Sequence, residues 1–144
     1  MLFTGMCRTA IKSCIFIALH SKRGTIVNVQ QIAREINENE HSIAKILQGL
    51  AKANIVESIK GVKGGFMMSE KQLGTPMLEL VRMMDESFTG TKCVLGLQKC
   101  DDVKPCPLHP EYLRIRGRIL TILNENTIEG FANKVEFGKS FLLN

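Results

Sequence analysis

Long apolar runs are missing from this chain, and so is a convincing secretory signal at its start. A membrane-spanning helix needs roughly 20 consecutive apolar residues. The longest apolar candidate, residues 14–19, is short and comes soon after a lysine. We therefore expect a protein that does not enter a membrane and that works in the cytoplasm, where thiols normally stay reduced.

Several catalytic patterns are also missing. The chain has no Cys-x-x-Cys pair, no phosphate-binding glycine loop and no His-Glu pair of the zinc-protease kind. A thiol–disulfide catalyst or a zinc hydrolase is the alternative of a different class, and these absences weigh against it. Five cysteines are an odd number for a disulfide framework. The sequence therefore predicts a protein that is not an enzyme.

The composition is that of a globular chain, but its charge is uneven. Of the 144 residues, 44% are hydrophobic and 23% are charged, which is enough apolar material for one core. Residues 1–66 hold nine Lys and Arg against four Glu, whereas residues 67–144 hold ten basic and ten acidic residues. The net charge of +5 thus lies in the first half, which indicates a polyanionic partner or a solvated basic surface.

The first half shows three helical patterns in succession. Apolar residues follow a helical stripe over residues 11–19. Asn28, with Gln31 three residues later, gives a variant of the capping box before the second helix. A polar turn over residues 37–39 leads into a third helix, residues 40–53, whose apolar face is Ile43, Ile46, Leu47 and Leu50. The order predicts a helix-turn-helix unit.

A hairpin follows these helices. Residues 55–60 predict a strand, residues 61–65 a glycine-rich turn and residues 66–68 a return strand. The expected fold is therefore mainly α with a small β-hairpin wing: a winged helix-turn-helix DNA-binding domain plus a long dimerisation helix. Side chains on the third helix and the hairpin tip would contact double-stranded DNA. These are His41, Ser42, Lys45, Gln48 and Lys52 on the helix, with Lys60, Gly61, Lys63 and Gly64 at the tip.

Two carboxylates near the start of the third helix do not suit phosphate contact. Glu38 and Glu40 would either accept a hydrogen bond from a cytosine or favour the helix N-terminus.

The second half begins with an amphipathic helix over about residues 76–87 and continues with a long helix over about 110–124. The long helix carries Leu and Ile on more than one side, which predicts a partner helix from a second copy of the chain. A two-fold dimer would read a pseudo-palindromic operator. No element is predicted for residues 127–144. The expected division is 1–70 for DNA binding, 71–92 for a connecting helix, 93–109 for a cysteine-rich loop and 110–144 for dimerisation and tail.

The cysteine-rich loop concentrates soft metal ligands. Cys93, Cys100, Cys106 and His109 are separated by six, five and two residues. Thiolate and imidazole are ligands for zinc or for an iron–sulfur cluster. One short pair with two widely spaced cysteines favours a cluster over zinc. Unliganded thiols, a regulatory disulfide, or a His109 that merely starts the helix are the alternatives.

With its N-terminal helix, its IVESIKGVKGGF wing and its cysteine loop with Cys-Pro-Leu-His, the chain resembles the Rrf-type bacterial transcription regulators, including IscR- and NsrR-like members. The resemblance covers nearly the whole chain. It implies a homodimer whose DNA affinity is controlled by an iron–sulfur cluster, a 2Fe-2S cluster rather than 4Fe-4S, and most simply a repressor. The implied cysteine ligands are Cys93, Cys100 and Cys106, and His109 matches the fourth ligand of IscR-like members.

The resemblance leaves one rival for the fourth ligand. Some family members use an acidic residue of the first helix from the opposite subunit. That position is Arg8 here, which as a cation cannot ligate iron. Its neighbour Cys7 could ligate, or could simply be a small residue of the first helix.

Overall fold

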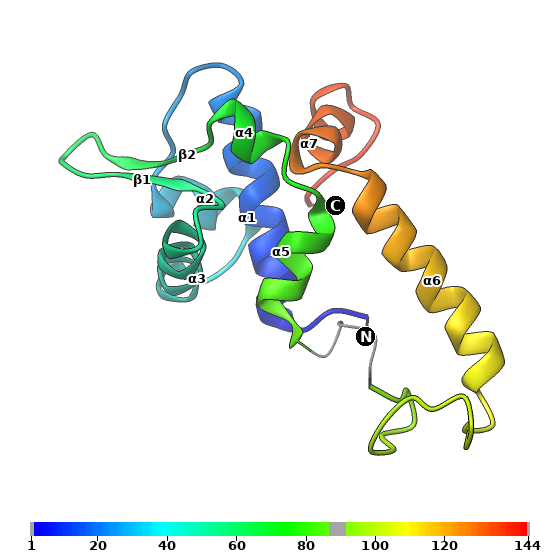
Figure 1. Cartoon of the computed structure of the whole chain (residues 1–144). Helices are drawn as coiled ribbons and strands as arrows, with labels where there is room; N and C mark the ends of the chain where they lie inside the picture. Colours follow the sequence, from blue (N-terminus) through cyan, green and yellow to red (C-terminus); the bar gives the residue numbers. More distant parts are fainter. Residues whose placement is uncertain (1, 87–91, 144) are drawn as a thin grey trace.

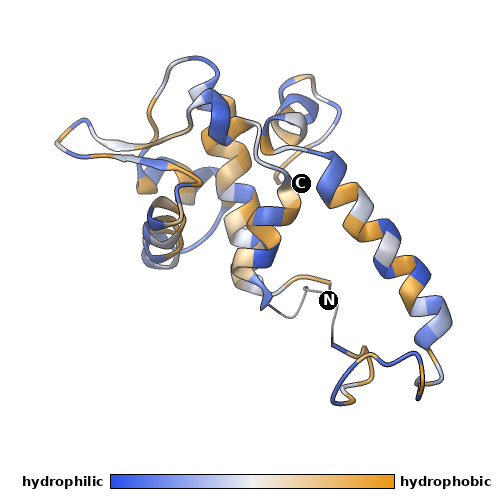
Figure 2. Ribbon diagram, viewed as in Figure 1, coloured by the Kyte–Doolittle hydropathy of each residue, from blue (hydrophilic) through white to orange (hydrophobic). Residues whose placement is uncertain are grey.

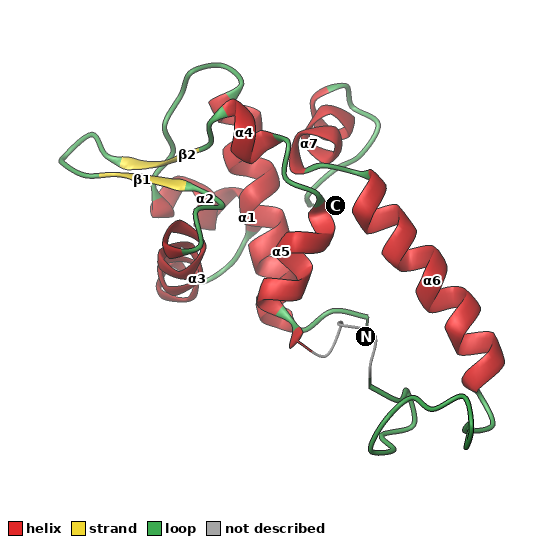
Figure 3. Ribbon diagram, in the orientation of Figure 1, coloured by secondary structure: helices red, strands yellow, loops and turns green. Residues whose placement is uncertain are grey.

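The structure is a computed structural model that describes residues 2–86 and 92–143 (Figures 1 and 3). It is mainly helical with one antiparallel hairpin, as the sequence predicts. The elements of the N-terminal half are α1 (Gly5–Ser21), α2 (Val29–Ile36), α3 (Glu40–Lys52), β1 (Glu57–Ile59) and β2 (Gly65–Met67). Those of the C-terminal half are α4 (Glu70–Leu73), α5 (Met77–Met84), α6 (His109–Glu125) and α7 (Ile128–Glu136).

Helix α1 is the centre of the fold. It contacts α2, α3, α5, α7 and β2, so the helix is buried on several sides rather than along one stripe. Residues 13–18 are all buried, including the polar Ser13. The first turn begins at the N-cap Thr4, whose hydroxyl accepts a hydrogen bond from Cys7 N at 3.2 Å. The two helices of the helix-turn-helix unit and the return strand of the hairpin are therefore positioned against this one helix.

The helix-turn-helix unit has the predicted caps. Asn28 and Gln31 form a reciprocal capping box at the start of α2, with both hydrogen bonds at 2.9 Å. Asn37 ends α2 in the left-handed conformation at φ 50°, which asparagine tolerates better than most residues. Asn39 then caps α3 by accepting from Ser42 N at 3.1 Å. The turn between the helices is thus only three residues long and closely specified.

The wing is attached to the head by a third extended segment. Glu57, Ser58 and Ile59 of β1 pair with Met67, Phe66 and Gly65 of β2. Phe66 also pairs with Val27 in the loop between α1 and α2, through backbone hydrogen bonds of 2.7 and 3.1 Å. Met68 N donates to Ser21 Oγ at 2.8 Å. The base of the hairpin is therefore held against both ends of the α1–α2 connection.

Two helices were not predicted from the sequence. The short α4 begins at Ser69, which forms a capping box with Gln72. Helix α7 lies in the tail for which no element was expected, and it packs on α1 with Ile128 and Ala132 buried. Its N-cap is Thr127. Helices α1–α5, the hairpin and α7 share one core and together form the head.

The remaining part is the arm, which consists of the cysteine loop (residues 92–108) and α6. Helix α6 runs away from α7, and the loop lies at its far end (Figure 1). Figure 2 shows apolar and polar residues alternating around α6 instead of one apolar face turned to the head. Leu123 is buried and Ile119 and Leu120 pack on the core, whereas Ile115 and Ile122 are exposed. Among the described helices, none is both long and apolar enough to span a membrane.

The predicted boundaries of the connecting and long helices are close to the observed ones. The connecting helix begins after Pro76, as expected, but ends at Met84, and its predicted end at Ser87 lies outside the described residues. The long helix begins at His109 and ends at Glu125. Proline near its first turn suits a helix start, where an N–H has no helical partner.

Candidate nucleic-acid interface and cysteine loop

The outer face of α3 is fully available to a ligand. Its buried face consists of Ile43, Ile46, Leu47 and Leu50, which leaves the opposite face free of packing. Four predicted contact residues lie on that opposite face and are exposed, namely His41, Lys45, Gln48 and Lys52, and the fifth, Ser42, is exposed on the flank of the helix. The helix thus presents hydrogen-bond donors, two of them lysines, in one continuous stripe. Such a stripe fits the dimensions of a major groove.

The tip of the wing is built for a close backbone approach. Lys60, Gly61 and Lys63 are exposed, and Val62 between them is fully accessible. Gly61 has φ 109°, a conformation that residues with a side chain rarely adopt. At Gly64, a Cβ atom would lie 2.1 Å from Ile59 O. The turn therefore requires glycine at both places and presents two lysines beside a bare backbone.

The two carboxylates near the start of α3 have different environments. Glu40 lies in the first turn of α3, where a negative charge is favourable. Glu38 forms an ion pair of 2.8 Å with Lys12 of α1. The sequence-based alternatives for Glu38 did not include this partner, because the two residues are far apart in the chain and only the fold brings them together.

The cysteine loop brings the four predicted ligands together as two pairs. Cys93 accepts a hydrogen bond from the thiol of Cys106, and both residues are buried. Cys100 Sγ lies 3.3 Å from His109 Nδ1. All five cysteines are free thiols. In the described part of the chain, no three His, Cys, Asp or Glu side chains are close enough together to hold a metal ion.

The environment of Cys93 favours its thiolate. Burial alone would raise the pKa of the Cys93 thiol. Hydrogen bonds from the backbone N–H groups of Leu95 and Leu97, from the Cys106 thiol and from Gly96 N–H outweigh burial, and the pKa of Cys93 lies below its ordinary value. A thiolate is the form that binds metal and reacts with oxidants.

The contact of Asp102 with His109 was not predicted from the sequence, from which Asp101 and Asp102 were expected to be solvated carboxylates. Asp102 Oδ1 lies 2.7 Å from His109 Nε2. A carboxylate on one imidazole nitrogen orients the ring and makes the other nitrogen a better ligand or base. Asp101 instead pairs with Lys99 and accepts from Val103 N. The position of Asp102 among Cys and His residues was the sequence feature that could have indicated this contact.

Cys7 lies in a different environment from the loop cysteines. It lies within α1, and its side chain is fully buried in the core. Burial and the nearby carboxylate of Asp85 raise the pKa of Cys7 to about 11. A thiol that resists ionisation is a poor metal ligand. These features fit a packing role better than ligation.

The donor set of the loop suits an iron–sulfur cluster chemically. Three thiols and one imidazole, with a Cys93 whose pKa is lowered and a His109 ring held by Asp102, are the ligand types that such clusters use. The loop also has a little-packed apolar surface, because Val94, Leu95, Leu97, Val103 and Leu108 are all exposed. The two pairs would have to approach one another to share one cluster, and the loop has few core contacts that oppose this movement.

The described residues show clear similarity to known regulators. Residues 3–134 match the model of the Rrf2 family, described as an iron-dependent transcriptional regulator. The transcriptional regulator IscR of Pectobacterium atrosepticum is 25% identical over 136 residues, which cover 94% of this chain and 82% of that protein.

Two solved structures share the fold. CymR, the global cysteine regulator of B. subtilis, has a TM-score of 0.74 at 20% identity and is matched over 91% of this chain and 95% of its own. IscR of T. potens has a TM-score of 0.70 at 14% identity, over 95% and 90%. The helix-turn-helix unit, the wing and the family match over most of the chain lead to one conclusion: the protein belongs to the Rrf2 family and is a transcriptional regulator, not an enzyme.

Proposed function

We propose that the chain binds double-stranded DNA through α3 and the wing. The support is the exposed stripe of α3, the glycine-bounded tip and the excess positive charge of residues 1–66. The α3 side chains would contact bases and phosphates, and the wing would lie against the backbone or minor groove. The contacting residues are His41, Ser42, Lys45, Gln48, Lys52, Lys60, Gly61, Lys63 and Gly64. The working form is a repressor in the cytoplasm.

We further propose that two copies associate through α6. Ile115 and Ile122 are 59% and 42% exposed on a helix whose Ile119, Leu120 and Leu123 pack on the core of the head. Burying exposed Ile side chains against a second α6 would be favourable. A two-fold dimer would place two α3 helices on two half-sites of a pseudo-palindromic operator. In this division, residues 1–70 bind DNA, 71–92 connect, 93–109 bind the cofactor and 110–144 dimerise.

The regulatory group of the proposal is an iron–sulfur cluster, 2Fe-2S in preference to 4Fe-4S. Cys93, Cys100, Cys106 and His109 would hold it, with Cys7 as the weaker candidate for the fourth ligand. The cluster would supply sensitivity to oxidants, nitric oxide or iron supply. Asp102 would hold the His109 ring through Nε2, which leaves Nδ1 as the nitrogen for the metal. Binding would order a loop that has little core of its own.

One observation favours a second candidate, a thiol switch without metal. The Cys106 thiol already contacts Cys93, whose pKa is lowered. Oxidation of this pair to a disulfide by a peroxide would consume two thiols and reduce the peroxide. Zinc bound by the same donors is the remaining alternative.

Anaerobic isolation separates these candidates. The protein from iron-replete cells should be coloured and contain iron and acid-labile sulfide in comparable amounts. Cys106→Ala should remove both, whereas Cys14→Ala, the same change at a buried thiol of α1, should keep both. A colourless protein with zinc, or without metal, would overturn the cluster and favour the corresponding alternative.

A further inference from the structure

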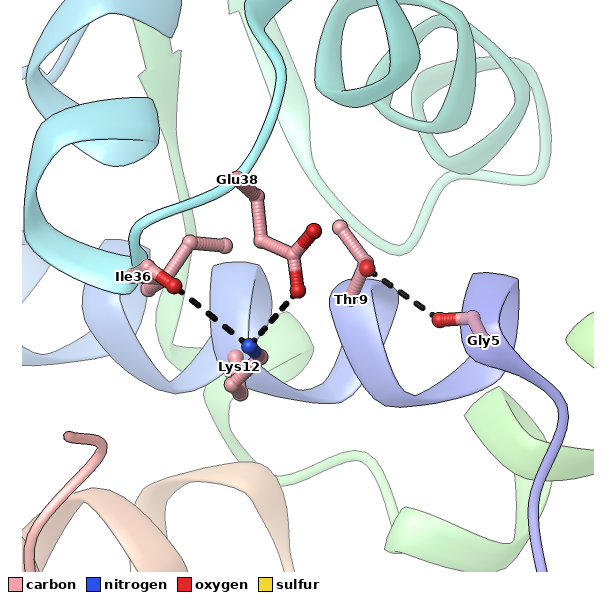
Figure 4. A network of polar contacts seen from close by, with 5 residues as sticks. All are labelled: Gly5, Thr9, Lys12, Ile36 and Glu38. Carbon is pink, nitrogen blue, oxygen red and sulfur yellow. Dashed lines mark hydrogen bonds and ion pairs between the residues drawn. The ribbon is translucent and has the colours of Figure 1, made fainter. Parts of the chain in front are cut away.

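One lysine of α1 contacts both the end of α2 and the turn that joins α2 to α3 (Figure 4). Lys12 Nζ lies 3.4 Å from Ile36 O, in the last residue of α2, and 2.8 Å from Glu38 Oε1, in the turn that leads to α3. Carbonyl groups at a helix C-terminus lack helical partners, and a cation suits that end of the dipole. The contact is therefore favourable at both of its acceptors.

The local backbone makes this contact consequential. The turn consists of residues 37–39 only, with Asn37 in the left-handed conformation and Asn39 as the cap of α3. Glu38 lies between them, so a displacement of Glu38 is passed directly to the first turn of α3. Figure 4 shows Lys12 reaching up from α1 to both acceptors, with Thr9 one turn earlier on the same helix.

We propose that Lys12 is a positioning residue for DNA binding. By holding Ile36 O and Glu38, it fixes the angle at which α3 is presented, without touching DNA itself. The inference rests on the proposed function, because α3 is the reading helix only if the chain binds DNA through it. A half-exposed ion pair of this kind contributes little to global stability. Its effect is on the fraction of molecules whose α3 is correctly oriented.

The expected size follows from that fraction. An apparent dissociation constant equals the intrinsic one divided by the competent fraction. If loss of Lys12 reduces the competent fraction of each head to about one half, a dimer that needs both heads binds about fourfold more weakly. We therefore expect a roughly three- to tenfold loss of affinity in Lys12→Met.

The chain contains a matched control on the same helix. Lys22, just after α1, forms an ion pair with Glu136 of α7 at 2.8 Å, the same distance as Lys12 to Glu38. The side-chain exposures are also similar, 26% and 36% for Lys12 and Glu38 against 22% and 24% for Lys22 and Glu136. Lys22→Met removes one positive charge and one interhelical pair, as Lys12→Met does, but far from the turn before α3.

The test compares the two variants on one DNA probe. The probe is a duplex selected by the wild-type protein from a random-sequence pool, and binding is followed by fluorescence anisotropy. Lys12→Met should bind three- to tenfold more weakly, and Lys22→Met should stay within about twofold of wild type. Urea unfolding should give similar small losses of stability for both. Equal affinities of the two variants would overturn the proposal.

Glu38 provides the second variant, because the two explanations predict opposite signs. If only net charge mattered, Glu38→Ala would bind DNA more tightly, since a negative charge near the phosphates is removed. Positioning predicts weaker binding, because Lys12 loses its partner. The exchange Lys12→Glu with Glu38→Lys should recover part of the affinity lost in Lys12→Glu alone. Tighter binding by Glu38→Ala would sink the inference.

The outcomes for the inference and for the proposed function can be told apart. If the wild-type protein selects no duplex, the proposed DNA binding fails, and this inference fails with it. If the wild-type protein selects a duplex and the Lys12 and Glu38 variants bind it equally well, the proposed function stands and only the positioning role is lost.

Discussion

The head and the arm are stabilised in different ways. In the head, large apolar residues are fully buried around α1, and the starts of α1, α2, α3, α4 and α7 carry side-chain caps. In the arm, α6 begins at Leu108 without a side-chain cap, and the loop before it has five exposed apolar residues. A single chain completes the head, whereas the arm is left with apolar surface that a partner or a cofactor would cover.

This difference separates the part of the molecule that has a fixed shape from the part that can respond to a ligand. The shape of the proposed DNA-binding surface, α3 and the wing, depends on packing inside one chain, so a regulatory signal would not easily alter it. The arm has few packed contacts of its own, and weakly packed segments respond most to ligands. In the proposed dimer, a rigid head and an adaptable arm would let a signal change the spacing of the two heads rather than the heads themselves.

The largest contrast is expected between Leu47 of α3 and Ile115 of α6. Leu47 is fully buried and Ile115 is 59% exposed. Leu47→Ala should lower the free energy of unfolding by about 2–5 kcal/mol, because it leaves a cavity in the head. Ile115→Ala should change it by no more than about 0.5 kcal/mol in the dissociated chain. Urea unfolding at low protein concentration measures both changes.

The same Ile115→Ala variant also tests the proposed dimer. If α6 packs on its copy, the variant should raise the dimer dissociation constant about tenfold, since one Ile per chain loses apolar burial. Sedimentation equilibrium gives this constant. An unchanged dimer dissociation constant, together with a large loss of monomer stability, would show that Ile115 packs within its own chain and that α6 does not form the dimer contact.

Glycine substitutions should give changes of opposite sign in the two regions. At Gly64 in the wing, a Cβ atom would lie 2.1 Å from a backbone oxygen, so Gly64→Ala should destabilise by about 1–3 kcal/mol and weaken DNA binding. Gly117 in α6 has nothing within 4 Å of its Cβ position. Gly117→Ala should stabilise the arm by up to about 1 kcal/mol through helix propensity. Thermal unfolding of both variants checks the signs, and a destabilised Gly117→Ala would reveal a close partner at that point of α6.

The smallest effect is expected where the end of α7 pairs with the end of α1. The hydrogen bond and charge of Lys22, with a smaller part from Arg23, hold the pKa of Glu136 below its usual value. A lowered carboxyl pKa stabilises the fold above the unfolded value of about 4.3, and this contribution disappears as the pH falls through the lower folded value. Glu136→Gln should therefore be less stable than wild type at pH 7, and the gap should close near pH 3. A gap that persists at low pH would show that charge is not its cause.

The sequence was sufficient where the signals are local. The capping box of Asn28 with Gln31 and the polar turn over residues 37–39 were both predicted and are both present. The wing was predicted from two strand segments on either side of a glycine-rich turn, and the structure pairs Glu57, Ser58 and Ile59 with Met67, Phe66 and Gly65. In each case, neighbouring residues carry the whole signal, so no knowledge of distant partners is needed.

What the sequence could not provide depends on distant partners. Helix α7 had a usable signal, since Thr127 caps a stripe of Ile128, Phe131, Ala132 and Val135, but its stability comes mainly from packing on α1. The contacts of Lys12 with Glu38 and of Asp102 with His109 join side chains whose approach no local pattern indicates. Four ligands were predicted in the loop, yet their arrangement as two pairs follows from the path of the backbone.

The arm is an excursion whose two ends are both fixed to the head. It departs after α5 and returns where Thr127 pairs with Pro76, with Met77 N bonded to Asn126 O and Ile128 N to Thr75 O. Closing such an excursion costs entropy that grows with its flexible length, by about 0.6 kcal/mol for each doubling. A ligand that orders residues 92–108 therefore lowers the entropy cost of closing the arm. This favours the packing of α7 on α1. Binding of a ligand to residues 92–108 should therefore raise the temperature at which α7 separates from α1.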